Sequence, residues 1–275
     1  WPLSGDFGKT DLSQFEEATN CCIDSGFKTF DVAPNYGGGF AESAIGKIYA
    51  GERDIVINTK FGNSINGVKD FTSSALRRSL ESSLERLKVQ NINTLFLHNP
   101  RDEIQDFQSI EHLMDDLKKE GLISYSAISV AKDYPYSHLP NLDSVQFDCN
   151  LLYLKELDLY KDRFKKKYVR SPLATGILSG KISRNTTFPS DDQRSEWLIG
   201  ERLDAIMKRV ETLEQIQDDF DLPSLARKFL IQQNDIDFVI FGIRNKHQVE
   251  GIVNDLKSDS ISQDIMTSII ELERN

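Results

Sequence analysis

The chain has 275 residues, of which 39% are hydrophobic and 28% charged, and its formal net charge is −10. This length is close to the roughly 250 residues of one closed α/β barrel, and a chain of this size can fold without disulfide bonds or metals. The negative charge argues against a broad nucleic-acid surface, which needs clustered Lys and Arg, so we expect no nucleic-acid partner. No stretch approaches the ~20 apolar residues of a membrane span, so we expect no membrane partner.

The cysteines and the start of the chain bear on its compartment. Cys21, Cys22 and Cys149 are odd in number and two of them are adjacent, which suits no disulfide framework. No Cys/His spacing is typical of a metal site, so we expect no metal. No signal-peptide pattern is present, and these features together favour a reducing, cytoplasmic location. Because the sequence starts at Trp1 without an initiator Met, we expect the true N-terminus to lie upstream.

Predicted helices and strands alternate along the chain. A capping box at Ser13–Glu16 predicts a helix that Gly26 ends, and the second predicted helix begins at Thr72. Apolar residues at helical spacing predict further helices within 110–119, 203–213 and 261–272. The predicted strands, in chain order, are 28–33, 55–59, 94–98, 123–130, 144–147, 168–171 and 238–242.

This alternation predicts an α/β fold, a (β/α)8 TIM barrel. The strands are short and apolar throughout, which is typical of parallel strands buried on both faces. We expect the first strand to be truncated, with its remainder around Trp1–Leu3. No Gly-x-Gly-x-x-Gly follows the first predicted strand, which disfavours a doubly wound dinucleotide fold. No linker divides the chain, so we predict one domain over 1–275, with 175–190 as a long loop that covers a site.

Polar residues that can carry chemistry stand at the ends of three successive strands. Asp31, Lys60 and His98 occupy these ends, and Tyr36 lies on the glycine-rich loop after Asp31. Active sites of such barrels lie where strands end, so we expect the four side chains to converge. An ammonium next to a phenol favours the phenolate, and an imidazole can orient a carbonyl by hydrogen bonding. The set therefore suits Tyr36 as a general acid beside Lys60.

These residues also carry a family resemblance. Phe30–Gly37, with Glu42 and Gly46, resembles the first signature of the aldo-keto reductases, and Asn58–Gly62 and Ser83–His98 resemble the segments that hold the family's lysine and histidine. The resemblance implies a single barrel with an Asp, Tyr, Lys and His tetrad, here Asp31, Tyr36, Lys60 and His98. It also implies hydride transfer between a nicotinamide cofactor and a carbonyl or alcohol carbon.

The resemblance extends to the cofactor-binding segments. It assigns to the cofactor a set of strand-end and loop residues: Ser129, Gln146, Arg170, Ser171, Pro172, Leu173, Gly176, Lys181, Gly242, Arg244 and Gln248. Arg244 would meet the adenosine 2′-phosphate, which implies NADP(H), with NAD(H) as the alternative. Three positions depart from the family pattern. Val130 cannot hydrogen-bond the carboxamide through its side chain, Arg170 replaces a stacking Tyr, and Gly251-Ile252 replaces a Glu-Asn pair.

Substrate residues are harder to predict, because substrate loops vary. Trp1, Phe61 and Asn99 are candidates, and the polar loop 99–102 favours a carbonyl compound or a hydroxylated, sugar-like molecule. Two other functions remain open. Lys60 could act as a Schiff-base nucleophile, although a neighbouring Asp31 would keep it charged. The chain could also be a cofactor-binding regulatory protein with little turnover.

Overall fold

The computed structural model describes residues 12–49, 54–100, 104, 106–134, 139–216 and 220–274. Helices and strands alternate over most of these residues, as the sequence predicts. The strands are β1 (Thr29–Asp31), β2 (Val56–Phe61), β3 (Ile92–His98), β4 (Ile123–Ser129), β5 (Ser144–Asp148), β6 (Lys166–Arg170) and β7 (Phe238–Val239). The helices are α1 (Leu12–Asp24), α2 (Phe40–Tyr49), α3 (Ser73–Leu87), α4 (Phe107–Lys119), α5 (Lys155–Tyr160), α6 (Arg194–Trp197), α7 (Gly200–Ile216), α8 (Leu222–Ile231), α9 (Lys246–Lys257) and α10 (Gln263–Arg274), with a 3₁₀ segment η3 (Ala174–Ser179).

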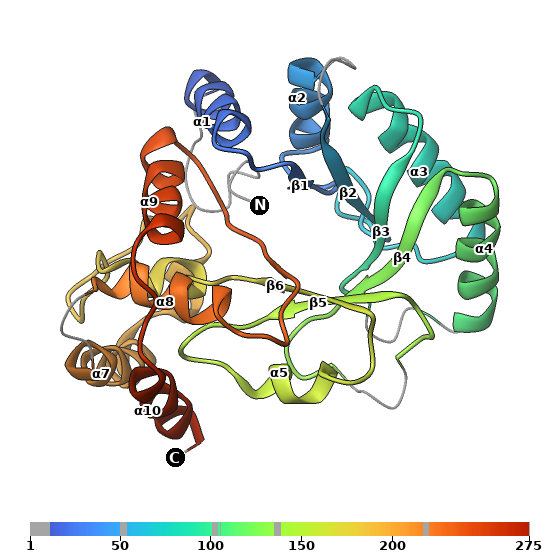
Figure 1. Ribbon diagram of the computed structural model, residues 1–275. Helices are drawn as coiled ribbons and strands as arrows, with labels where there is room; N and C mark the ends of the chain where they lie inside the picture. The colour runs from blue at the N-terminus through green and yellow to red at the C-terminus, as the bar shows by residue number, and fades with distance from the viewer. Residues whose placement is uncertain are drawn as a thin grey trace.

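The strands form one curled parallel sheet. Its order is β1-β2-β3-β4-β5-β6-β7, and every neighbouring pair is parallel. Helices α2, α3 and α4 lie along the outer side of the strands that precede or follow them (Figure 1). Sequential parallel strands with helices outside are the topology of a (β/α)8 barrel, so the predicted fold class is confirmed. The predicted remnant of a first strand, Trp1–Leu3, lies outside the described residues.

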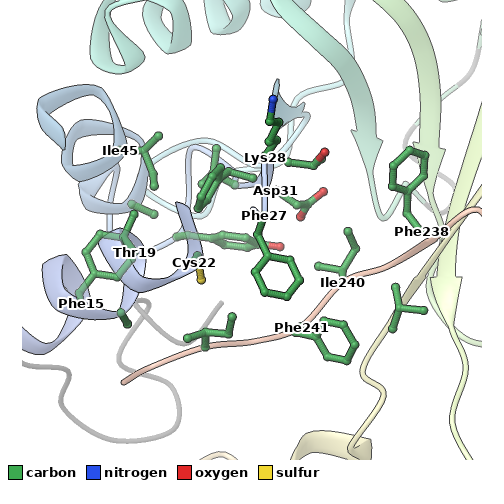
Figure 2. A pocket seen from close by; sticks show the side chains of 18 of the residues that line it. Phe15, Thr19, Cys22, Phe27, Lys28, Asp31, Ile45, Phe238, Ile240 and Phe241 are labelled. Carbon is green, nitrogen blue, oxygen red and sulfur yellow. The ribbon is translucent and has the colours of Figure 1, made fainter. Parts of the chain in front are cut away.

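In the described part of the chain, the sheet has an open seam between its two edge strands, β1 and β7. Among the described residues, β1 pairs only with β2 and β7 only with β6. A cavity of about 470 Å³ lies at this seam, lined by α1, β1 and the segment that includes β7. Figure 2 shows Phe15 and Cys22 on one side of this cavity and Ile240 and Phe241 on the other. The cavity lining includes Asp31 and Tyr36 but neither Lys60 nor His98, so the cavity lies between the two edge strands and reaches the loop after β1.

Helix ends follow local sequence signals at several positions. Thr72 caps α3 by accepting from the Ala75 N–H, as predicted, and Asp106 caps α4 in the same way. Gly26 has a φ of 87°, and its N–H donates to Ile23 O after α1 ends. This left-handed conformation favours glycine, so the predicted stop is confirmed. The predicted start at Ser13 is wrong by one residue, because α1 begins at Leu12 and Ser13 lies in its first turn.

The second half of the barrel holds more helix than the sequence analysis predicted. Only 203–213 was expected to be helical between the last two strands, but α6, α7 and α8 all lie there. Asp221 caps α8, and a proline occupies its first turn, a combination that marks a helix start. The last strand is shorter than predicted, since β7 ends at Val239. No helix in the described part of the chain is long and apolar enough to cross a membrane.

Candidate active site

Four predicted residues converge at the carboxyl ends of the first three strands. Asp31 ends β1, Lys60 lies one residue before the end of β2, and His98 ends β3. Side chains alternate along a strand, and those of Lys60 and His98 point to the interior of the curled sheet, toward Asp31 and Tyr36. Tyr36 comes from the loop after β1, where its N–H bonds to Ala33 O. The structure therefore brings these side chains into contact at one rim of the barrel.

The contacts among them are direct. The Lys60 ammonium donates to Asp31 Oδ1 and, at 2.9 Å, to Val32 O. Lys60 Nζ lies 5.1 Å from the centre of the Tyr36 ring, and the Tyr36 and His98 rings meet edge to face with centroids 5.8 Å apart. The Lys60 and Asp31 side chains are 0% and 6% exposed. A buried ion pair thus lies beside a buried phenol and an imidazole.

Burial and charge set the protonation of these groups. Burial disfavours the charged form of Lys60, but the Asp31 carboxylate and Tyr36 outweigh it and raise the pKa of the ammonium. Burial raises the pKa of Tyr36, and the charge of Lys60 opposes that rise. Burial, followed by the charges of Lys60 and Arg170, lowers the pKa of His98 well below its usual range. At neutral pH the site therefore holds a charged lysine, a protonated phenol and a neutral imidazole.

The strand that carries Lys60 is held from its outer side by Glu42 of α2. Thr59 donates to Glu42 Oε1 at 2.6 Å, and Arg86 Nε donates to Oε2 at 2.7 Å. Gly46 allows this packing, because a Cβ there would lie 2.2 Å from Arg86 O. Glu42 and Gly46, noted in the sequence signature, therefore lie behind the strand and support the position of Lys60.

A second group of polar side chains fills the adjoining part of the barrel mouth. Gln146 Nε2 donates to Asp31 Oδ2 at 2.9 Å, and Ser129 Oγ donates to Gln146 Oε1 at 2.9 Å. Arg170 Nη1 donates to Ser129 Oγ at 3.0 Å, and its Nη2 donates to Val130 O at 2.7 Å. The predicted cofactor residues Ser129, Gln146 and Arg170 thus form one connected network with Asp31.

Asp148 is a member of this network that the sequence analysis missed. Its Oδ2 accepts from Arg170 Nη2 at 3.1 Å. The residue ends β5, two positions after Gln146, so strand alternation places both side chains on the same face. That alternation was the signal available in the sequence. The carboxylate fixes the plane of the Arg170 guanidinium and balances its charge.

Glu156 is a buried carboxyl close to this network. It is 1% exposed, its Oε1 accepts from Asp133 N and Tyr153 OH, and its Oε2 has no partner among the described residues. Burial is the main cause that raises its pKa from 4.5 to about 7, and Asp148 adds to the rise. The fold therefore favours the uncharged form of this side chain.

We expect this carboxyl to make the stability of the protein depend on pH. Because the folded-state pKa is raised, the stabilising contribution is complete below the unfolded value of 4.5 and is lost as pH rises through about 7. Glu156→Gln should remove this dependence, a difference of about 2 kcal/mol in the free energy of unfolding. Urea unfolding of both proteins at about pH 5 and about pH 8 measures it. Parallel pH profiles for the two proteins would contradict the assignment.

The loop after β6 has a backbone suited to a ligand. Ser171, Ala174, Thr175 and Gly176 have φ values of 59°, 47°, 55° and 96°. Three of them are not glycine, and strained backbone of this kind gathers at ligand sites. Pro172 is buried, Leu173 is half-buried, and Lys181 lies exposed just beyond η3. This strained loop next to Arg170, at the carboxyl end of β6, is therefore a candidate ligand-binding segment.

The other predicted cofactor residues lie at the start of α9. Arg244 N donates to Gln248 Oε1 at 2.7 Å, and Asn245 caps the helix by accepting from the Gln248 N–H. Gly242 lies exposed in the segment that leads to this turn. Burial, followed by the charge of Arg194, lowers the pKa of the Arg244 guanidinium, so a second cation lies near it. Asp192 pairs with the Arg194 guanidinium and balances its charge, so the cation that a phosphate at this helix N-terminus would meet is Arg244.

The three predicted substrate residues differ in where they lie relative to the site. Asn99 lies at the rim with a φ of 51°, and its Oδ1 accepts from Arg170 Nη1 at 3.1 Å. Phe61 is 0% exposed and its ring packs against Phe71, so the structure gives it a place in the core. Trp1 lies outside the described residues.

The chain is similar to known proteins over nearly its whole length. Residues 1–274 match the model of the aldo/keto reductase family. The chain is 25% identical over 273 residues to aldo-keto reductase YhdN of Bacillus subtilis, covering 92% of this chain and 82% of that protein. It is 24% identical to D-threo-aldose 1-dehydrogenase of a Pseudomonas species, covering 80% and 76%. The structure of glycerol dehydrogenase AKR11B4 from Gluconobacter oxydans is similar in fold, with a TM-score of 0.83 at 22% identity, covering 99% and 89%.

Proposed function

Because the chain belongs to the aldo/keto reductase family of oxidoreductases, we propose that it reduces a carbonyl group with NADP(H), with Tyr36 as the general acid. The observation that carries the proposal is the contact of Tyr36 with Lys60 and His98, beside the buried Lys60–Asp31 pair. In this proposal, Asp31, Tyr36, Lys60 and His98 each have a separate role in the reaction. Enzymes of this family generally use NAD(P)H, which supplies a hydride to the substrate carbon when it is bound.

The protein's own part in the reaction is to orient the substrate and to move one proton. The neutral imidazole of His98 donates a hydrogen bond to the carbonyl oxygen and fixes its orientation. The phenol of Tyr36 then gives its proton to the oxygen as negative charge develops there. Lys60 stabilises the phenolate that remains, and Asp31 holds Lys60 in place and keeps it charged. This charged state also counts against Lys60 as a Schiff-base nucleophile, which must be neutral.

The cofactor would lie across the mouth from β5 to α9. Arg170 would stack beneath the nicotinamide, Gln146 and Ser129 would meet its carboxamide, and the loop from Ser171 to Lys181 would cover the diphosphate. The four acceptors around Arg170 support this role, because they hold its guanidinium plane in one orientation. The helix N-terminus at Gln248 and the guanidinium of Arg244 would take the 2′-phosphate.

Cofactor binding and turnover test the proposal together. Titration of the protein with NADPH and with NADH should quench the cofactor fluorescence, and NADPH should bind more tightly. Consumption of NADPH should then follow the addition of one or more members of a panel of aldehydes, ketones and aldoses. If neither cofactor binds, the proposed function is wrong. If NADPH binds tightly and no carbonyl compound is reduced, the regulatory alternative is favoured.

Arg244→Ala tests the preference for NADP(H). The variant should weaken NADPH binding by roughly 10- to 100-fold, because a charge-assisted bond to the 2′-phosphate is lost. Binding of NADH, which has no 2′-phosphate, should change by less than about threefold. Fluorescence titrations of both cofactors measure the two constants. Equal weakening of NADPH and NADH binding would show that Arg244 does not contact the 2′-phosphate.

The substrate class we propose is a small aldehyde, ketone or sugar. The similar proteins include one named for an aldose and one named for glycerol, both of them hydroxylated compounds. Asn99 at the rim is a polar side chain that could meet such a hydroxyl group, although Arg170 already occupies its Oδ1. Comparison of aldoses with apolar aldehydes of similar size measures the preference directly.

A further inference from the structure

Gln146 uses both ends of its amide inside the site. Its Nε2 donates to Asp31 Oδ2 and its Oε1 accepts from Ser129 Oγ, each at 2.9 Å, and the residue is 1% exposed. The chemistry fixes this orientation, because an ionised carboxylate only accepts hydrogen bonds and so must face the amide nitrogen. Gln146 is thus a bonded partner of the catalytic carboxylate as well as a predicted contact of the cofactor.

Each oxygen of Asp31 then has one partner. Oδ1 accepts from Lys60 and Oδ2 accepts from Gln146. Two bonds to two fixed groups prevent the carboxylate from rotating, and the Lys60 ammonium depends on that orientation for its own position. Gln146 itself is held by Ser129, which accepts from Arg170. A continuous hydrogen-bonded path therefore joins the guanidinium at the proposed nicotinamide site to the ion pair beside Tyr36.

We propose that Gln146 is a positioning residue for the Asp31–Lys60 pair, and that it couples the nicotinamide end of the pocket to the proton-transfer group. The inference rests on the proposed function, since it assumes that Tyr36 transfers a proton. A contact between Gln146 and the carboxamide alone would affect cofactor affinity. The positioning role affects in addition the pH at which Tyr36 acts, because Lys60 is the cation that stabilises its phenolate.

Gln146→Met removes the amide while keeping a similar volume. At saturating NADP, alcohol oxidation should slow by roughly 10-fold. Because oxidation needs the phenolate, the limb along which its rate rises with pH should move up by about one pH unit, the size of one lost bond to a charged group. Gln232→Met is the matched control, because Gln232, the C-cap residue of α8, also bonds through both amide ends, there to the backbone of Ile261. An unshifted limb in Gln146→Met, as in the control, would overturn the proposal.

Gln146→Glu makes a sharper test of the same contact. Two carboxyl groups at this distance cannot both be ionised, so they share a proton and bind together only when one of them is protonated. In carbonyl reduction, turnover should therefore approach that of the native enzyme at acidic pH and fall already through the neutral range, a limb absent from the native enzyme and from Gln232→Glu. If the new limb does not form, the amide does not act through Asp31.

A measurement without cofactor separates this inference from the proposed function. In a double-mutant cycle of Gln146→Met and Asp31→Asn, the two changes should couple by at least about 10-fold in the unfolding equilibrium constant. Additive effects would overturn the positioning role even in an active enzyme. Conversely, failure of the native protein to bind NADPH or to turn over would refute the proposed function, while strong coupling in the cycle would still support the contact.

Discussion

Tyr36→Phe is expected to lower kcat for carbonyl reduction by roughly 10²–10⁴-fold, the contribution of a well-placed general acid. The change removes the hydroxyl and keeps the ring, which is 7% exposed and packs edge to face on His98. Because that packing survives, the affinity for NADPH and the thermal midpoint should stay close to the native values. Steady-state kinetics at saturating NADPH, with a fluorescence titration of the cofactor, measure both effects.

The pH profile gives this prediction a second readout. Burial raises the pKa of Tyr36, so the phenol keeps its proton through the neutral range and reduction should decline only at alkaline pH. The lowered pKa of His98 keeps that imidazole neutral, so it should add no limb between about pH 6 and 8. The residual activity of Tyr36→Phe should lack the alkaline limb. A variant within about threefold of the native kcat would rule out the phenol as the acid.

The tetrad could be predicted from the sequence because strand ends fix position in a barrel. Asp31, Lys60 and His98 each stand where a short apolar run stops, and parallel strands deliver their carboxyl ends to one rim. The alternation of side chains along a strand also distinguishes Phe61, which faces outward, from Lys60, which faces the barrel interior. Neighbours on a strand point to opposite faces, so the residue after an interior lysine belongs to the outer packing layer, where Phe61 meets Phe71.

The network around Arg170 was harder to predict, because its bonds join residues distant in sequence. Asp148 at the end of β5 and Val130 just after β4 contact this guanidinium, and no local sequence pattern pairs either of them with Arg170. Helices α8 and α9 were also missed, although the caps at Asp221 and Asn245 mark their starts and Leu222, Leu225 and Phe229 in α8 recur at helical spacing. Local sequence patterns predict which residues stand at the strand ends. Which of these residues form hydrogen bonds and ion pairs depends on the register of the sheet, which local patterns do not specify.

The largest effect on stability is expected for Lys60→Met. Lys60 is 0% exposed, and its removal leaves the Asp31 carboxylate buried with Gln146 as its remaining side-chain donor. Loss of one partner of a buried ion pair costs about 3–5 kcal/mol in the free energy of unfolding. Turnover should also fall by more than about 10²-fold, because the phenolate of Tyr36 loses its nearest cation. Urea unfolding and kinetics on the folded fraction measure the two losses separately.

A double variant separates the structural cost from the chemical one. Asp31→Asn combined with Lys60→Met removes both charges, so no unpaired ion remains and much of the lost stability should return. Turnover should not return, because the cation beside Tyr36 is still absent. Recovery of activity together with stability would mean that Lys60 serves the fold alone and has no part in proton transfer. Recovered stability without activity would place the ammonium in the reaction itself, as the charge that makes an otherwise weak phenolic acid effective.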